Sequence, residues 1–259
     1  MGVSALLMFL SLNPEQHFNG VKHPLMVALL VFCGVYAAYR LSDLKPSLQL
    51  RPLRFKLGSF SPDFIIAVLL AATLLILACP GYQFILQFGM AGLIAVSYYT
   101  ISASRHQTFG GLRSIYLIKN LSLACAWALT TAPVHPGEEG MLFHFAERFF
   151  FLLALSLLID LRDINTDKAN SIHTLAGTIG TANTRLLTVT LLAGAILLSV
   201  FYSYKTGDYS LLNAAVFSYL LTILSAFFLN NGSTFLTFLV LVDGNLLLHG
   251  ILTFFFKRL

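Results

Sequence analysis

Charged residues are scarce in this chain. Only 10% of its 259 residues are Asp, Glu, Lys or Arg, against about 25% in an ordinary soluble domain. Because 57% of the residues are hydrophobic, and even a large folded domain cannot hide that much apolar surface from water, a water-soluble globular protein is disfavoured. With a mean hydropathy of +0.80, the composition predicts a protein that is solvated largely by lipid.

Cysteine is also scarce, and the three cysteines that occur have no CxxC or Cys–His spacing. A disulfide framework and a zinc site are therefore not indicated. The formal net charge of +5 is compatible with nucleic-acid binding. However, the sixteen Lys and Arg residues are scattered between apolar runs, which is typical of membrane topology signals, and we expect no nucleic-acid partner.

Apolar runs of the length of a membrane-spanning helix recur along the chain. A span needs about 20 mostly apolar residues bounded by Pro, Gly or charge. Such runs occupy residues 24–39, 63–79, 82–101, 112–131, 141–159, 186–204, 209–229 and 234–256. Residues 1–12 are apolar but form only about 18 Å of helix, so we interpret them as the second half of a further helix. The sequence thus predicts an all-α, polytopic integral membrane protein of about nine transmembrane helices, the first truncated, in a single domain over residues 1–259.

The basic residues are unevenly divided between the two sides of these predicted helices. If the first helix runs outward, one side carries Arg40, Lys45, Arg51, Arg54, Lys56, Arg105, Arg113, Arg162, Lys168 and Arg185, and the other carries Lys22, Lys205, Lys257 and Arg258. The positive-inside rule makes the first side cytoplasmic. We therefore expect a multi-pass protein of a bacterial inner membrane, with its site facing the cytoplasm, where the long connections 41–62 and 160–185 lie.

Three carboxylates stand at helical spacing at the end of the predicted helix 141–159. Asp160, Asp163 and Asp167 are related as i, i+3 and i+7 in LLIDLRDINTDKANSIHTLAGTIG, so they are expected to share one helix face. Like charges near a bilayer require a cation, and oxygen-rich clusters favour Mg²⁺, which substrate phosphates commonly complete. A metal-bridged diphosphate is one interpretation. The other is a solvated turn in which Arg162 and Lys168 form surface ion pairs with the acids.

The same segment resembles the second aspartate motif of the UbiA family of intramembrane prenyltransferases. The pattern D-x-R-D-x-x-x-D-x-x-x-x-x-x-T-L is formed by Asp160, Arg162, Asp163, Asp167, Thr174 and Leu175. This resemblance implies a ring of nine helices with a cavity open to the cytoplasm. It also implies Mg²⁺-assisted transfer of an isoprenoid group from an isoprenoid diphosphate to a hydrophobic acceptor, aromatic or lipid. Asp163 and Asp167 would then be catalytic metal ligands, and Asp160 an auxiliary ligand.

The first aspartate motif of that family, of the form N-D-x-x-D-x-x-x-D, is degenerate here. The corresponding stretch reads VYAAYRLSDLKPSLQLRP and keeps only Asp43 as a candidate metal ligand. Because a guanidinium can hold phosphate in a bidentate way without metal, we predict that Arg40 binds part of the diphosphate. The alternative is that Arg40 and the basic residues after it contact lipid headgroups.

Lys119 lies within the predicted helix 112–131, where an ammonium must face a polar interior. It shares a helix face with Tyr116 and Asn120, and we predict that it binds the diphosphate together with Arg162. The alternatives are an ion pair with Asp43 or another ion pair between helices.

Several other polar or small residues within the spans are predicted to be structural. Glu147 and Arg148 are expected to form a salt bridge. Asp243, Asn245 and His249 are expected to contact a neighbouring helix, although Asp243 is also a candidate proton acceptor. The glycines at positions 89 and 92 are expected to allow close helix packing.

Two other functions remain open at the level of sequence. One is a non-catalytic UbiA-like membrane protein that binds a prenyl lipid, which the degenerate first motif favours. The other is a small-solute transporter with a relay of Lys119, Asp243 and His249, although no inverted repeat supports it.

Overall fold

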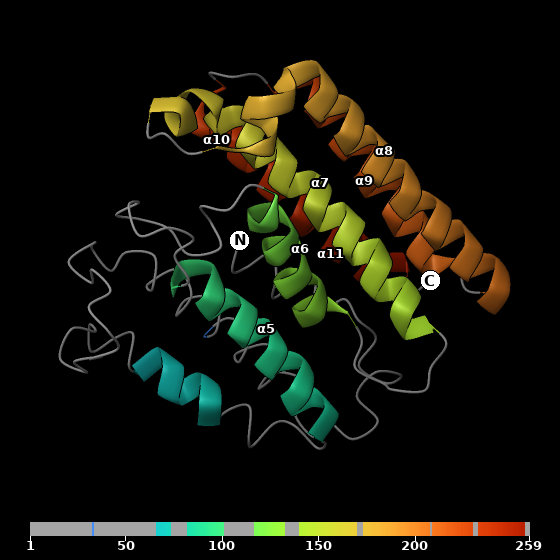
Figure 1. Ribbon diagram of the computed structural model, residues 1–259. Helices are drawn as coiled ribbons and strands as arrows, with labels where there is room; N and C mark the ends of the chain where they lie inside the picture. The colour runs from blue at the N-terminus through green and yellow to red at the C-terminus, as the bar shows by residue number, and fades with distance from the viewer. Residues whose placement is uncertain are drawn as a thin grey trace.

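The computed structural model describes residues 33, 66–73, 82–100, 117–132, 140–169, 173–207, 209–229 and 233–256. The regular elements in this part of the chain are all helical, which confirms the predicted fold class. They are α5 (Tyr82–Thr100), α6 (Ile118–Thr131), α7 (Gly140–Ala169), α8 (Leu175–Thr206), α9 (Ser210–Phe228), α10 (Phe235–Phe238), the π-helical η3 (Leu239–Asp243) and α11 (Gly244–Phe256), shown in Figure 1. Residues 1–12 lie outside the described residues, so a truncated first helix and a total of about nine helices stay predictions.

Three of the described helices are long and apolar enough to cross a membrane: Leu142–Ala169, Leu175–Thr206 and Leu236–Thr253. Shorter apolar helices occupy Ile85–Ala95 and Leu212–Phe228. These helices, together with the outward-facing apolar side chains described below, support the prediction of an integral membrane protein.

Helix α7 is the centre of the described bundle (Figure 1). It packs against α6 on one side and α8 on the other, while α8 packs against α9 and α9 against α11. Its side chains Phe151, Leu158 and Leu161 are fully buried in the hydrophobic core. Elements that follow one another along the chain are therefore mostly neighbours in space, as short connections favour.

Helix α8 carries small residues on its buried face and large apolar residues on its exposed face. The hydroxyls of Thr184, Thr188 and Ser199 each donate to the carbonyl four residues earlier, at 2.8, 2.9 and 3.0 Å. These bonds satisfy the buried hydroxyls within the helix, and the small side chains let α7 approach closely. On the opposite face, Leu186 and Leu197 are 66% and 68% exposed. This distribution is the reverse of that in a water-soluble helix and suits contact with lipid.

Two helices extend further than the hydropathy of the sequence predicts. Helix α7 continues for ten residues beyond Ile159, through the acidic segment, to Ala169. Helix α8 begins at Leu175 instead of residue 186, and it is kinked at Gly180, whose φ of 81° and ψ of 168° suit glycine alone. Among the described residues, no atom lies within 4 Å of a Cβ added at Gly89 or Gly92, so the predicted close helix packing at these glycines is not seen in this part of the structure.

Candidate active site

The acidic segment lies at the far end of α7 from Gly140. Helix α7 has 30 residues, so it is about 45 Å long, against about 30 Å for the hydrocarbon core of a bilayer. Asp160 lies about 30 Å along the helix from Gly140. If the apolar part of α7 spans the membrane, the acids therefore occur where the helix leaves the hydrocarbon, which is where charged side chains cost least.

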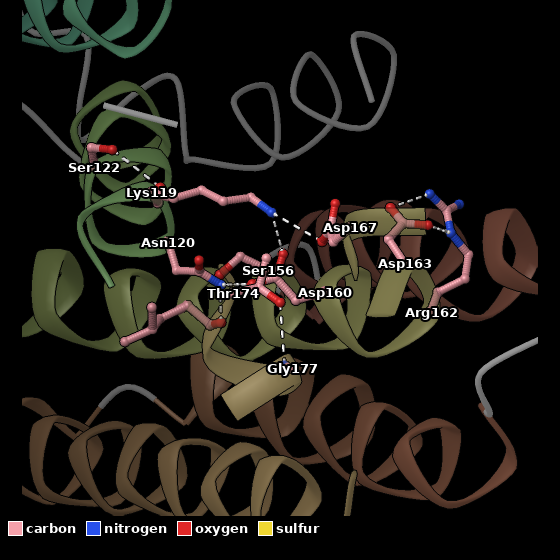
Figure 2. A network of polar contacts seen from close by, with 11 residues as sticks. Lys119, Asn120, Ser122, Ser156, Asp160, Arg162, Asp163, Asp167, Thr174 and Gly177 are labelled. Atoms are coloured by element: carbon pink, nitrogen blue, oxygen red, sulfur yellow. Dashed lines mark hydrogen bonds and ion pairs between the residues drawn. The ribbon is translucent and has the colours of Figure 1, made fainter. Parts of the chain in front are cut away.

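Asp160 is fully buried and is held by two residues from the start of α6. The Nζ atom of Lys119 lies 2.5 Å from its Oδ1 atom, and Nδ2 of Asn120 donates to its Oδ2 atom at 2.9 Å (Figure 2). Both carboxylate oxygens therefore have partners, as a buried carboxylate requires. Lys119 therefore forms an ion pair between helices, which was one of the alternatives expected for it. The other alternative, an ion pair with Asp43, and the predicted role of Arg40 concern residues outside the described part of the chain.

Lys119 also faces a second carboxylate of the same helix. Its Nζ atom lies 4.0 Å from Oδ2 of Asp167, so the ammonium is located between two turns of α7 (Figure 2). Asp167 is buried, with only 7% of its surface exposed. Two carboxylates therefore face the ammonium of Lys119 from successive parts of α7.

Asp163 takes part in a separate and more exposed ion pair. Arg162 donates from Nε and Nη2 to the two oxygens of Asp163, at 2.6 and 2.8 Å. The guanidinium also lies 4.2 Å above the ring of Phe238 in α10, in a cation–π arrangement. The three acids that were expected on one face are therefore divided between two basic partners, Lys119 and Arg162 (Figure 2).

The described acids fit a magnesium site only as a part of it. Within the described ranges, no group of three or more His, Cys, Asp or Glu side chains is placed to hold a metal ion. Mg²⁺ is nevertheless usually bound through one or two carboxylates and completed by water and substrate phosphates. Asp163 and Asp167, one helical turn apart, supply that number of carboxylates. Both oxygens of Asp163 accept from Arg162, just as both oxygens of Asp160 accept from Lys119 and Asn120. A metal ion on Asp163 would therefore have to displace Arg162 from at least one oxygen.

An apolar cavity begins one helical turn from Asp160. It offers about 40 Å³ to water-sized molecules and is lined by Leu123, Ala124, Trp127, Leu152, Leu155, Ser156, Ile159, Val242, Asp243 and Leu246. Helices α6 and α7 and the η3–α11 segment each contribute to it. The sequence did not indicate Trp127 or Ser156 as lining residues, because neither interrupts the apolar pattern. Asp243, in contrast, could be recognised as an acid within an apolar run, and it lies on the cavity wall at the end of η3.

Other predicted residues prove to have local structural roles. The hydroxyl of Thr174, within the matched motif, accepts from the backbone N–H of Gly177 at 3.2 Å and so caps α8. Arg148 Nε lies 3.4 Å from Glu147 Oε2, as predicted. Asn245 donates to Ser225 Oγ at 3.1 Å, which confirms its expected contact with a neighbouring helix.

Comparison with known proteins gives matches to solved structures alone. No protein-family model and no curated protein matches the sequence. A digeranylgeranylglyceryl phosphate synthase structure matches with a TM-score of 0.61 and 16% identity, over 98% of this chain and 92% of that chain. A UbiA homologue from Archaeoglobus fulgidus, bound to GPP and Mg²⁺, matches with a TM-score of 0.60 and 12% identity, over 100% of this chain and 94% of that chain. The predicted resemblance to the UbiA family is therefore confirmed at the level of the fold.

Proposed function

We propose that this protein is a membrane-embedded prenyltransferase that transfers an isoprenoid group from an isoprenoid diphosphate to a hydrophobic acceptor. The observation that carries this proposal is the proximity of a charged cluster and an apolar cavity along α7: Ser156 and Ile159 line the cavity within one turn of Asp160. A prenyl diphosphate has the matching division into a charged head and a hydrocarbon tail. The fold shared with a UbiA homologue bound to GPP and Mg²⁺ supports the same substrate class.

In this proposal, acidic residues bind the metal ion and basic residues bind the phosphate oxygens. Asp163 and Asp167 bind Mg²⁺, with Asp43 as a further ligand from outside the described residues. When bound, Mg²⁺ neutralises charge on the leaving diphosphate. Lys119, Arg162 and Arg40 donate to the phosphate oxygens. Asp160, whose auxiliary metal role stays a prediction, orients the ammonium of Lys119.

The proposed reaction breaks the allylic C–O bond, and the electron pair leaves with the diphosphate. A nucleophilic atom of the acceptor then forms a bond to the allylic carbon and loses its proton. Cationic groups near the leaving oxygen lower the barrier to the first step, most effectively in a site from which water is excluded. The cavity wall supplies an aromatic face from Trp127, which stabilises positive charge on carbon, and a carboxylate from Asp243, which is a candidate acceptor for the proton.

Release of diphosphate by the purified protein tests this proposal. The full chain in nanodiscs is incubated with radiolabelled geranyl, farnesyl and geranylgeranyl diphosphates, Mg²⁺ and a panel of membrane lipids and aromatic acids. We expect release that depends on Mg²⁺ and falls at least 100-fold in Asp163→Asn and Asp167→Asn. Asn165→Ala is the matched control, because Asn165 is exposed on the same turns of α7.

Absence of release by the wild-type protein with every donor would contradict the enzymatic proposal. Binding of a prenyl diphosphate without release would indicate instead the non-catalytic prenyl-lipid-binding protein. Solute flux in proteoliposomes without either result would indicate the transporter. Labelling of Cys variants near Asp163 from one side of the membrane tests whether the site faces the cytoplasm.

A further inference from the structure

A second polar pocket lies in the bundle, well away from the acidic cluster. It is lined by Phe143, His144, Glu147, Arg148, Leu198, Ser199, Tyr202 and His249, from α7, α8 and α11. Arg148 precedes Asp160 by about 18 Å of helix. The pocket offers about 10 Å³ to water-sized molecules, roughly the space that one water requires. It does not depend on the proposed prenyl transfer.

Two deeply buried polar side chains contribute atoms without a partner to this pocket. Arg148 and His249 are 2% and 1% exposed. Neither Nη1 of Arg148 nor Nε2 of His249 has a hydrogen-bond partner among the described residues. An unsatisfied buried polar atom costs about 1–3 kcal/mol. Because Arg148 and His249 both line the same small pocket, a single group bound there is a candidate partner for both atoms.

The tautomer of His249 depends on the hydrogen bond that Ser218 makes on the far side of the imidazole, and we take the tautomer in which Ser218 donates to a backbone carbonyl. Ser218 Oγ lies 2.6 Å from Nδ1 of His249 and also donates to the carbonyl of Ala214 at 2.9 Å. A hydroxyl has one hydrogen, so when Ser218 gives it to Ala214, the Nδ1 atom must be the donor to Ser218 Oγ. The Nε2 atom of His249 then carries a lone pair and accepts, whereas Nη1 of Arg148 donates.

Arg148 and Glu147 form an ion pair beside the pocket, so their charges offset each other and neither a cation nor an anion is favoured over a neutral occupant. The guanidinium of Arg148 would repel a cation, and the carboxylate of Glu147, 3.4 Å from Arg148 Nε, would repel an anion. A neutral group that both accepts and donates matches the pair of open atoms. We propose that this pocket binds one hydroxyl oxygen, which accepts a hydrogen bond from Arg148 Nη1 and donates one to His249 Nε2.

The hydroxyl has two candidate sources with the same chemistry. A water molecule matches the volume of the pocket. A membrane-soluble alcohol or phenol would place its hydroxyl in the pocket and its carbon skeleton beside Phe143 and Tyr202, which contribute to the lining. If the pocket takes an organic alcohol or phenol, adding one should displace the water from the pocket. If the pocket takes water alone, the added alcohol should leave the water in place.

Solid-state NMR of the full chain in nanodiscs, with ¹⁵N-labelled histidine, tests the proposal directly. The chain has seven histidines, and His249→Gln identifies the signal of His249 by its loss. We expect the Nδ1–H tautomer and magnetisation transfer from a hydroxyl hydrogen to the Nε2 atom of His249, which is the nitrogen remote from the Ser218 hydroxyl. Saturable loss of water transfer on adding 1-octanol or 4-propylphenol identifies an organic hydroxyl, and unchanged water transfer identifies water.

A paired variant and a matched control test the role of Arg148. Glu147→Gln combined with Arg148→Met removes both charges at nearly constant volume, and we expect loss of the hydroxyl transfer. Tyr204→Phe, on an 82% exposed residue of α8, should leave the transfer unchanged. An Nε2–H tautomer in the wild-type protein, or an Nε2 atom without contact to any hydroxyl hydrogen, would overturn the proposal even if the paired variant did not fold.

Discussion

The ammonium of Lys119 on α6 lies 2.5 Å from a carboxylate oxygen of Asp160 on α7. This ion pair joins the start of one helix to the place where the other leaves its apolar segment. It also provides a partner for the first acid of the cluster, which helps to explain why α7 continues through the charged segment. A diphosphate that binds Lys119 therefore has to share the ammonium with Asp160 or displace it.

Removing one member of this pair should destabilise the bundle more than removing both. Lys119→Met leaves the buried carboxylate of Asp160 without its cation, and we expect a loss of about 3 kcal/mol. Asp160→Asn together with Lys119→Met should restore a substantial part of that loss, because no buried charge is then left unpaired. Unfolding of the single and double variants in mixed micelles measures the coupling. Additive losses would mean that the two side chains do not interact.

Alanine at the kink of α8 should be destabilising. Gly180 has φ 81° and ψ 168°, which an L-residue adopts only at a cost of about 1–3 kcal/mol. Among the described residues, no atom lies within 4 Å of a Cβ added there, so the expected cost comes from the backbone conformation. Gly194→Ala is the matched control, since its Cβ would make an ordinary contact of 3.7 Å with Phe150. Equal thermal stabilities of the two variants would be inconsistent with the kink.

Filling the apolar cavity should shift the preference for donor length. Ala124 is buried on the cavity wall, so Ala124→Leu is expected to lower the rate with a geranylgeranyl donor at least 10-fold more than with a geranyl donor. Ala126→Leu adds the same side chain to the same helix at a half-buried position that does not line the cavity. A parallel decrease for both donors, or an equal effect of Ala126→Leu, would argue against the cavity as the site of the prenyl tail.

A charge on the exposed face of α8 should oppose membrane insertion. Leu197 is 68% exposed and Tyr204 is 82% exposed, close to the end of the helix. Lysine near the middle of a span costs about 2.5–3.5 kcal/mol, whereas near an end it can reach the interface. We therefore expect Leu197→Lys to reduce insertion strongly and Tyr204→Lys to reduce it little, as measured by glycosylation mapping in microsomes. Equal insertion would indicate that this face does not contact lipid.

The helices were predictable because the apolar runs are long and their boundaries carry Pro, Gly or charge. The ends of α7 and α8 were not, since hydropathy falls at Ile159 while the helix persists to Ala169. The cap of α8 by Thr174 and the turn at Gly180 follow from local hydrogen bonding and backbone conformation. A hydropathy pattern does not contain that information.

The candidate site was predictable in its residue types but not in its pairing. Spacing placed Asp160, Asp163 and Asp167 together, because positions on one helix are fixed relative to each other. The pairing of Lys119 with Asp160 depends on the approach of α6 to α7, so this partner could be named only as a candidate. Arg162 precedes Asp163 on α7, and its ion pair with the acids was one of the expected alternatives. The salt bridge of Glu147 with Arg148 was predicted, whereas the open atoms of Arg148 and His249 were not.

The amino-acid sequence by itself determined that this chain is helical and lipid-solvated, and that it concentrates carboxylates at one end of a helix, because periodicity and composition are properties of single segments. The tertiary structure alone decided that Lys119 is held by Asp160 and that an apolar cavity reaches to within a turn of the charged cluster. It also decided that Arg148 and His249 line one small pocket. Each of these features requires side chains from different helices, and their distances are set by the packing of the bundle.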